Sequence, residues 1–598
     1  MELVTIGSLI KQLRKEKMGI SRKKLADGLC SAQMIYEIER DQYESDPLMI
    51  DVLLQRMGKS PDKLERVLQS EMYYMIRIRD LLEKAILKGK KALAESILET
   101  YPLKTNLDKM YQYRMKASLF YHIDKDYDKA LENLLVAIHI TLPEFSYKKI
   151  RNYLISTIEM ENLLAFERIK IEKNQKCDKI LERQHLELCM EYIDKHFTDD
   201  EEHAKIYAKC AWLIGKIDYY EGKYISAMNI CQKGMEGLRK NTMIYFMSPL
   251  LKIIVQAEEQ MGITSEHSKC VQYYNILMLL RKFFAKKWYP MDTIFHNCCQ
   301  KEYHLDYELF RDERKEKGMT QEEFADGIYQ DNSSISRFET GKASPNKKTF
   351  RRMTQKLGME KGRYNGYVVA DSFEVMELRT QLDILEMRRR YMEARKTLEK
   401  MKEQLNLQIE ENRIVVKFHE TVISYYLGEV SEQCAIEKIK RLMKTVIEDN
   451  NIVFYHIPMR NEVLMINQLF ILLNEIGQKQ IAIKLMQCVL QKMYNSKISL
   501  KYRYRSYALL LNNYVRVCRK WNFAVEALNI ELLCGKASMI PFCINNILKV
   551  LEKEGVSDTI LDQWSIAVYY MSDLYFFDKE KEIYREYLEV NRRITIVD

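Results

Sequence analysis

An internal duplication constrains the fold of this 598-residue chain more than any other feature. The tetrapeptide at residues 14–17 recurs 300 positions later at residues 314–317, and residues 25–28 recur as residues 324–327. Further matches follow in the same order: Ile38-Glu39 with Phe338-Glu339, Ala94 with Ala394, Leu98 with Leu398, Pro143 with Pro458, and Asn152 with Asn467. The offset drifts from 300 to 315, as insertions in surface loops would make it do. The order of the matches predicts two copies of one unit, each a small module followed by a long helical array.

Composition predicts an all-α protein of several domains. The chain contains only 9 Pro and 20 Gly, which leaves few residues for the turns of β-hairpins. Lys, Glu, Leu, Ile, Met and Tyr supply long helical runs instead. A chain of this length exceeds what one hydrophobic core supports. With 47% hydrophobic and 30% charged residues, it is expected to be an ordinary soluble globular protein rather than a disordered one.

The net charge, the cysteine spacing and the lengths of the apolar runs indicate which partners to expect: nucleic acid, a metal ion or a membrane. The net charge of +9 is compatible with nucleic-acid binding, although a large solvated surface can carry the same surplus. The 13 cysteines are scattered singly except for Cys298-Cys299, and His296 has no second ligand pair at zinc spacing. This pattern indicates free thiols in a reducing cytosol and no metal site. No signal peptide is evident and no apolar run approaches the roughly 18 to 20 residues of a membrane span, so we expect a cytoplasmic protein without membrane contact.

Residues 306–358 carry the clearer small module. Residues 309–317 predict an amphipathic helix that a glycine ends. Thr320 is a natural N-cap, and Glu323 three residues later completes a capping box for a second helix. A third helix over residues 332–339, with the sequence NSSISRFE, would turn its two large apolar residues inward and its small polar residues and arginine outward.

The second module resembles the XRE-type helix-turn-helix family (phage-repressor and Cro-like regulators) over the stretch TQEEFADGIYQDNSSISRFETGKASP. The resemblance implies binding to double-stranded DNA through the third helix, since small polar residues can approach base edges and arginine can reach guanine or phosphate. By position in the motif, Gln321 and Lys342 would contact or approach the phosphate backbone. The residues on the base-reading face would be Asn332, Ser333, Ser334, Ser336 and Arg337.

A buried ion pair is expected in both modules. The Arg–Glu pair that the family carries maps to Arg314 and Glu339, and the same spacing recurs as Arg14 and Glu39. We interpret this pair as structural, because a paired buried charge can hold a module together without contacting DNA.

The first module, residues 6–58, departs from the pattern. Its second helix begins near Arg22, and its recognition segment covers residues 31–39. Gln33 could read adenine, and Arg22 with the two lysines after it could meet phosphate. Glu37, however, stands where the second module has its arginine, and a carboxylate facing DNA is repelled unless it accepts a hydrogen bond from cytosine. The module either contacts DNA or retains the fold only for packing.

Four segments carry the rhythm of tetratricopeptide repeats, in which a small residue on the second helix faces apolar partners on the first. They are residues 126–130, 222–227, 477–482 and 521–524. Such hairpins stack into a curved solenoid with a concave inner face. The expected fold class is therefore all-α, with two helix-turn-helix modules that are each followed by an α-solenoid of tetratricopeptide-like helix hairpins.

The domain order resembles the peptide-pheromone-sensing regulators of Gram-positive bacteria, the Rgg, PlcR and PrgX group. That resemblance implies a sequence-specific transcription regulator whose helical array senses a short signalling peptide. The expected modules are residues 1–68 and 303–366, and the expected arrays are residues 69–302 and 367–598. Members of the group carry one such unit per chain and dimerise. Two units in tandem therefore predict either an intramolecular pseudo-dimer or a homodimer of the chain.

The register of the second array predicts a peptide-binding face. If Ala482 and Ala524 are the small residues of their helices, the inner face includes Asn467, Asn474, Asn513 and Arg516. A mid-helix asparagine is unfavourable for helix stability, but its amide can both donate to and accept from a peptide backbone. The arginine could pair with a terminal carboxylate. The alternative is that these asparagines bond neighbouring helices or water.

Enzyme chemistry has little support in the sequence. No nucleotide-binding loop, catalytic triad or HExxH motif occurs, so neither a catalytic residue nor a cofactor is expected. Two rivals to the regulator remain. One is a protein-interaction scaffold whose helix-turn-helix modules are vestigial. The other is a nucleic-acid-processing enzyme, which would need a carboxylate or metal cluster that the sequence does not reveal.

Overall fold

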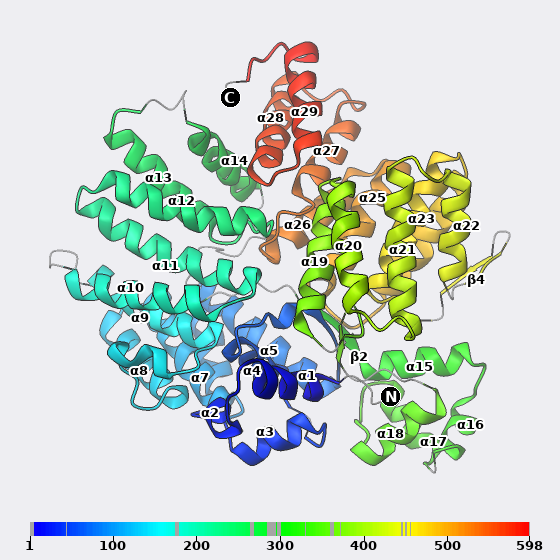
Figure 1. Ribbon diagram of the computed structural model, residues 1–598, viewed down its shortest axis with the longest axis horizontal. Coiled ribbons are helices and arrows are strands. Elements are labelled where there is room, and N and C mark those ends of the chain that lie inside the picture. The colour runs from blue at the N-terminus through cyan, green and yellow to red at the C-terminus, as the bar shows by residue number, and fades with distance from the viewer. Residues whose placement is uncertain are drawn as a thin grey trace.

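The computed structural model describes residues 5–43, 45–173, 179–263, 268–283, 295, 301–328, 330–358, 364–366, 368–370, 372–443, 446–448, 451–454 and 456–596. Figure 1 shows a predominantly helical chain, in which a small module precedes a helical array twice over. The all-α prediction is confirmed. The few short strands form two small sheets that composition did not predict.

Four helices form the first module: α1 (Ile6–Gln12), α2 (Arg22–Ala26), α3 (Ala32–Glu39) and α4 (Pro47–Arg56). Serine caps begin the two central helices, because Ser21 accepts from the amide of Lys24 and Ser31 from the amide of Met34, both at 3.1 Å. A π-helical turn follows α1 at Leu13–Lys17, and a 3₁₀ turn at Pro61–Lys63 leads into β1 (Leu64–Leu68).

Five helix hairpins form the first array: α5 (Ser70–Leu87), α6 (Lys91–Thr100), α7 (Asn106–Leu119), α8 (Tyr127–Thr141), α9 (Thr157–Lys173), α10 (Ile180–His196), α11 (Asp200–Tyr220), α12 (Tyr224–Lys240), α13 (Met247–Gln260) and α14 (Lys269–Phe283). A 3₁₀ helix at Tyr147–Asn152 precedes α9, and a π-helical turn at Phe120–Asp124 follows α7.

The second module repeats the first: α15 (Asp306–Glu316), α16 (Gln321–Asp326), α17 (Asn332–Glu339) and α18 (Lys347–Lys356), with β2 (Glu302–Leu305) before it and β3 (Tyr364–Gly366) after it. The predicted capping box of Thr320 and Glu323 is present. Ile335 and Phe338 are buried as predicted.

The second array contains α19 (Phe373–Met387), α20 (Tyr391–Gln404), α21 (Glu410–Tyr426), α22 (Glu432–Leu442), α23 (Arg460–Glu475), α24 (Lys479–Tyr494), α25 (Leu509–Cys518), α26 (Trp521–Leu533), α27 (Ile540–Leu551), α28 (Asp558–Leu574) and α29 (Asp578–Glu586). A β-hairpin of β4 (Val446–Glu448) and β5 (Asn451–Val453) precedes α23. Short helical turns lie at Leu500–Arg503, Tyr504–Ala508 and Tyr587–Asn591.

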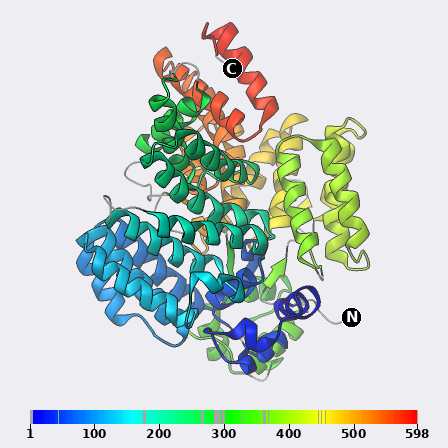
Figure 2. The ribbon, with the colours of Figure 1, turned by 60° about the vertical axis from the view of Figure 1, so that its left-hand side comes forward.

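The four tetratricopeptide-like segments each begin the second helix of a hairpin, as predicted. Their alanines are fully buried: Ala130, Ala227, Ala482 and Ala524. Gly222 and Gly477 turn two of these hairpins with φ of +75° and +83°, a conformation that glycine adopts without strain. The small residues allow the paired helices to pack closely, and the pairs stack along each array (Figure 2).

A three-stranded sheet joins the two modules. Strand β1, which ends the first module, lies between β2 and β3, which flank the second. It pairs parallel with β2 and antiparallel with β3, so that Glu65 lies opposite both Glu302 and Asn365. Strands separated by more than 200 residues in sequence therefore fix the two modules to one another.

Equivalent segments of the two halves pair with each other. In the antiparallel pairing of β1 with β3, Glu65 faces Asn365, its counterpart in the duplication. The loops after α12 and α26, which are also counterparts, meet at an antiparallel bridge between Met243 and Lys536. Antiparallel pairing of equivalent segments is what a two-fold axis produces. Equivalent segments of the two halves thus contact each other at two places within one chain.

Two matches in the predicted duplication are wrong, Pro143 with Pro458 and Asn152 with Asn467, since Pro143 lies just after α8 whereas Pro458 lies just before α23. Asn152 ends a 3₁₀ helix, whereas Asn467 lies in the middle of α23. The structural counterparts are instead the capping carboxylates Glu159 and Glu462, since each accepts from the backbone amide of the residue three before it, at the start of α9 and of α23. The earlier match of Ala94 with Ala394 holds, because both are fully buried at equivalent places in α6 and α20.

Candidate functional site

Both helix-turn-helix modules lie at one end of the molecule. Figures 1 and 2 both place the N-terminal module and the α15–α18 module together at the lower end, with the two arrays above them. In Figure 1, α3 and α17 lie at the lower edge, on the side away from the arrays. A single elongated partner could therefore contact both third helices.

The predicted ion pair holds each module together. Arg314 donates to Glu339 through Nε at 2.6 Å and Nη2 at 2.9 Å, and both residues are buried. Arg14 binds Glu39 in the same two-pronged way. A charge-assisted, bidentate pair of this kind both stabilises the contact and restricts the relative orientation of the two side chains. They tie the first helix of each module to the third.

Two predicted phosphate contacts are drawn into this ion pair. The amide of Gln321 donates to Glu339 at 2.7 Å, and Nε of Arg22 donates to Glu39 at 2.7 Å. Both residues are the first of their helix, which brings their side chains back over the third helix. In this structure they support the recognition helix, and the guanidinium of Arg22 also lies 5.0 Å from the ring of Tyr36.

Helix α17 presents the most accessible cation of the predicted reading face. Arg337 is exposed and has no side-chain partner among the residues that the structure describes. Lys342 just beyond the helix is also exposed and equally unpaired within that part of the chain. Asn332 is exposed at the N-terminal end, and Ser336 is half-buried. Phosphate and base edges are the ligands that such side chains bind.

An acidic cap at the start of α17 changes the predicted role of the serines. Asp331 accepts from Oγ of Ser333 at 2.5 Å and from Oγ of Ser334 at 2.7 Å, and also from the amide of Ser334. These hydrogen bonds lower the pKa of Asp331 to about 2. A permanent anion therefore lies beside the predicted reading face. An Asp directly before the helix is the signal that could have revealed it.

The third helix of the first module has no comparably accessible cation at its centre. The amide of Gln33 donates to Glu37 at 2.9 Å, which engages the group that was predicted to read adenine. Arg40 bonds the hydroxyl of Tyr36. This hydrogen bond partly offsets the predicted repulsion between Glu37 and DNA. It also occupies the amide donor of Gln33, which would otherwise be available to a base.

The first module is also embedded in the body of the protein. Its buried Arg56 donates to Glu159 of the first array and to the carbonyl of Thr141. A Cβ at Gly28 would lie 2.2 Å from that same carbonyl, so only glycine allows the approach. Lys24, a predicted phosphate ligand, donates to the carbonyl of Asn152 at 2.6 Å.

Helix α18 distinguishes the second module further. Its counterpart α4, with the sequence PLMIDVLLQR, is almost entirely buried. The sequence of α18 is KKTFRRMTQK, and Lys348, Arg351 and Lys356 are exposed. Phe310, Phe324 and Phe338 centre the core of the second module, which continues into Leu68, Ile76, Ile498 and Tyr502 of the neighbouring elements. The outward side of this module presents a basic helix, which the motif-based prediction did not include.

A concave pocket lies in the second array. It has a volume of about 280 Å³ and is lined mainly by the first helices of successive hairpins, with Glu201 and Thr242 of the first array on one side. Three of the four predicted ligand residues line it: Asn467, Asn513 and Arg516. Asn474 does not, because it lies in the last turn of α23.

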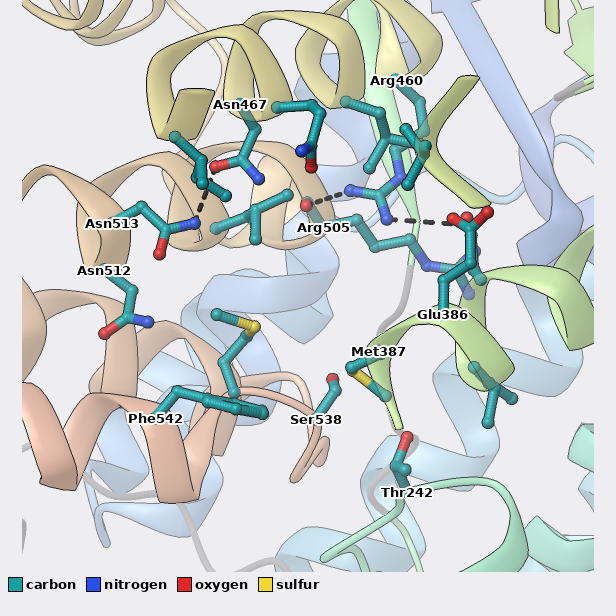
Figure 3. A pocket seen from close by; sticks show the side chains of 18 of the residues that line it. Thr242, Glu386, Met387, Arg460, Asn467, Arg505, Asn512, Asn513, Ser538 and Phe542 are labelled. Carbon is teal, nitrogen blue, oxygen red and sulfur yellow. Dashed lines mark hydrogen bonds and ion pairs between the residues drawn. The ribbon is translucent and has the colours of Figure 1, made fainter. Parts of the chain in front are cut away.

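The two pocket asparagines bond one another. Nδ2 of Asn513 donates to Oδ1 of Asn467 at 2.7 Å across α25 and α23 (Figure 3). This leaves Nδ2 of Asn467 and Oδ1 of Asn513 without a partner among the described residues, one donor beside one acceptor. Asn512, whose position no sequence pattern predicted, also lines the pocket and has a buried Nδ2 that no described group accepts from.

In the described part of the first array, buried ion pairs occupy the corresponding face. Lys209 of α11 and Arg114 of α7 both bind Glu161 of α9, and all three are buried. Arg114 also donates to the carbonyl of Phe295 at 3.2 Å, and the ring of Phe295 lies against the ring of Tyr121. Ion pairs and an aromatic ring occupy the place that is open in the second array.

A carboxylate–histidine cluster at the pocket wall is better explained by its neighbours than by a metal. Ligand atoms of Asp383, Glu386 and His419 lie within 4.8 Å of one another. Although burial raises the pKa of Asp383, Arg379 and Arg460 lower it to about 2. Two guanidinium groups beside a carboxylate oppose the binding of a further cation.

The cysteines present no metal site within the described chain. The ten described cysteines form no disulfide with one another. The predicted pair Cys298-Cys299 and the nearby His296 lie outside the described residues. No described helix is long and apolar enough to span a membrane.

Comparisons with known proteins identify the modules. Residues 10–64 and 310–362 both match the helix-turn-helix family. No curated protein sequence matches the chain. Among solved structures, Bacillus thuringiensis PlcR in complex with the peptide PapR7 and DNA is 15% identical, with a TM-score of 0.31 over 46% of this chain and 96% of that one.

Two further solved structures are also similar at low identity. The apo form of the same PlcR is 14% identical, with a TM-score of 0.27 over 46% of this chain and 97% of PlcR. The Cut9-Hcn1 hetero-tetramer of the APC/C is 12% identical, with a TM-score of 0.23 over 86% of this chain and 98% of that one. Likenesses this distant assign neither ligand nor partner to the present protein.

Proposed function

We propose that this chain, two segments of which match the helix-turn-helix family, is a transcription regulator that binds double-stranded DNA and is switched by a short peptide in the pocket of its second array. The observation that carries the DNA-binding part is the placement of Arg337 and Lys342. Both are exposed and unpaired within the described chain, at the end of the molecule where both third helices lie. Cations that serve no internal purpose at such a place suit an anionic partner.

The second module would provide most of the DNA contacts. It carries the exposed cations of α17 and of α18, whereas the first module buries α4 and ties Arg22 to Glu39. The first module, which is anchored in the first array, would instead hold its own third helix, α3, in a fixed position relative to the second module. Because the two third helices differ in sequence, the operator should consist of two unlike half-sites about 34 Å apart rather than a palindrome.

The experiment is a titration of labelled duplexes selected from a random library, repeated at several salt concentrations. We expect the logarithm of the binding constant to fall linearly with the logarithm of the salt concentration, because phosphate contacts release counterions. Replacing Lys348 and Arg351 by Ala should reduce the slope by about 2, since each phosphate contact contributes close to 1. Duplex binding that is absent at low salt would favour the scaffold alternative, in which the modules serve packing alone.

The peptide part rests on the unused amide groups of the pocket. Asn467 offers a donor and Asn513 an acceptor, side by side on adjacent helices (Figure 3). The donor can bind a backbone C=O of an extended peptide, and the acceptor can bind a backbone N–H. This recognition does not depend on the peptide's side chains. The open second array also contrasts with the described part of the first array, whose corresponding face carries buried ion pairs, so one peptide per chain is expected.

Calorimetry against peptides encoded near the gene tests this part. Asn467→Ala and Asn513→Ala should each weaken peptide binding, while Asn474→Ala is the matched control, since it removes an asparagine of the same array outside the pocket. Equal binding by all three variants would place the peptide elsewhere. If no peptide binds the wild-type protein, the array serves assembly or another ligand.

A further inference from the structure

Arg516 differs from the other cations of the concave pocket. Four cations line this pocket. Arg460 lies 3.8 Å from Asp383, while Arg505 and Lys536 lie 3.9 and 2.9 Å from Glu201. Arg516 alone has no carboxylate within ion-pair distance among the described residues. It is exposed, so its charge is available to something that enters from solvent.

A second cavity adjoins the first at this arginine. It has a volume of about 240 Å³ and shares Arg516 and Phe542 with the concave pocket. Lys549 of α27 and Arg389 also line it. Arg389 is neutralised by Glu580 at 2.6 Å, but Lys549 has no ion-pair partner among the described residues. Two cations without carboxylate partners therefore line the same cavity.

Hydrogen-bond donors in the cavity point to the same class of ligand. Asn545 accepts from the hydroxyl of Tyr584 through Oδ1 at 2.7 Å, which leaves its Nδ2 donor without a described partner. Although both side chains are exposed to solvent, partial desolvation by the cavity walls lowers the pKa of Arg516 and of Lys549, and repulsion from Arg516 lowers that of Lys549 further. An oxyanion between the two cations would relieve this repulsion and accept from the amide.

We propose that Arg516, Lys549 and Asn545 form an anion subsite at the junction of the two cavities, which takes the terminal carboxylate of the bound ligand. This subsite rests on the proposed peptide function for its natural occupant. Its chemistry is nevertheless that of any small oxyanion, such as inorganic phosphate. A peptide held by Asn467 and Asn513 would then have a defined direction, with its carboxyl end toward α27.

Inorganic phosphate is the first probe. Its apparent Kd is measured from the rise in melting temperature, with sodium chloride at equal ionic strength as reference. Arg516→Gln and Lys549→Gln should each weaken phosphate binding at least tenfold. Lys553→Gln is the matched control, since this lysine lies just beyond the end of the same helix but not in the cavity. Phosphate stabilisation that is unchanged in Arg516→Gln, or absent in the wild type, overturns the subsite.

Peptides separate the subsite from the proposed function. A pool of short peptides is compared as free acids and as C-terminal amides. A preference for the free acid that Arg516→Gln abolishes supports the subsite. Equal binding of acid and amide refutes the subsite but leaves peptide sensing intact. Phosphate binding at Arg516 without binding of any peptide supports the subsite and refutes the peptide function.

Discussion

Replacing Arg337 by Ala tests the DNA-reading face most directly. The guanidinium is exposed on α17 and has no side-chain partner among the described residues, so its removal leaves the Arg314–Glu339 pair and the buried core of the module intact. The melting temperature should therefore not change. Any loss of DNA affinity then reports a lost contact rather than a damaged fold.

The expected loss of DNA affinity depends on which of two contacts Arg337 makes, one to a base or one to a phosphate. A bidentate contact to guanine is worth about 1 to 3 kcal/mol, which corresponds to a roughly 5- to 150-fold weaker Kd. Such a loss should be confined to operators that carry the preferred base, and the salt slope should stay the same. A phosphate contact would instead weaken all duplexes alike and lower the slope by about 1.

Fluorescence anisotropy at fixed salt measures both quantities, with the selected operator and single-base variants of it. Arg441→Ala serves as control, because this arginine is 79% exposed on α22, in the second array. Lys342→Ala should show the phosphate pattern. If Arg337→Ala binds the operator as tightly as the wild type while Lys342→Ala does not, α17 does not read bases through this residue.

Three further changes have defined outcomes. Burial, with Glu65 beside it, raises the pKa of Glu302 from 4.5 to about 7. The stability that the protonated form contributes is complete below pH 4.5 and lost as pH rises through 7, so Glu302→Gln should raise the melting temperature at pH 8 and change it little at pH 5. Asp331→Asn keeps a helix cap but removes the anion beside the reading face, so it should tighten DNA binding several-fold in titrations at low salt; weaker binding would contradict the proposed orientation. Glu339→Ala leaves Arg314 buried and unpaired, at a cost of about 3–5 kcal/mol, and hydrogen exchange should quicken in residues 306–356 but not in the arrays.

Local signals in the sequence were enough to predict the helices and the modules. The capping box of Thr320 and Glu323, the ion pair of Arg314 and Glu339, and the buried alanines of the hairpins each depend on residues that lie close in sequence or in a fixed motif. The sheet was not predictable in this way. It depends on the pairing of Glu65 with Glu302 and Asn365, which no local pattern announces.

The site was predicted only in part, for a related reason. A motif assigns a position to a side chain but not its partner in the fold. Gln321 and Arg22 lie where the family motif puts them, yet each bonds the buried glutamate of its own module. Likewise, register placed Asn467 and Asn513 on the inner face, but their mutual hydrogen bond depends on how closely α23 and α25 approach.

The pairing of β1 with β3 inside one polypeptide has a consequence for dosage. A regulator assembled from two separate chains engages a two-part operator only after a bimolecular step, so at low abundance its occupancy varies with the square of the number of chains. Here the tether supplies the partner at a fixed effective concentration, and occupancy should vary with the first power. Each mutation also alters one half alone, so the two halves of the operator are free to diverge independently.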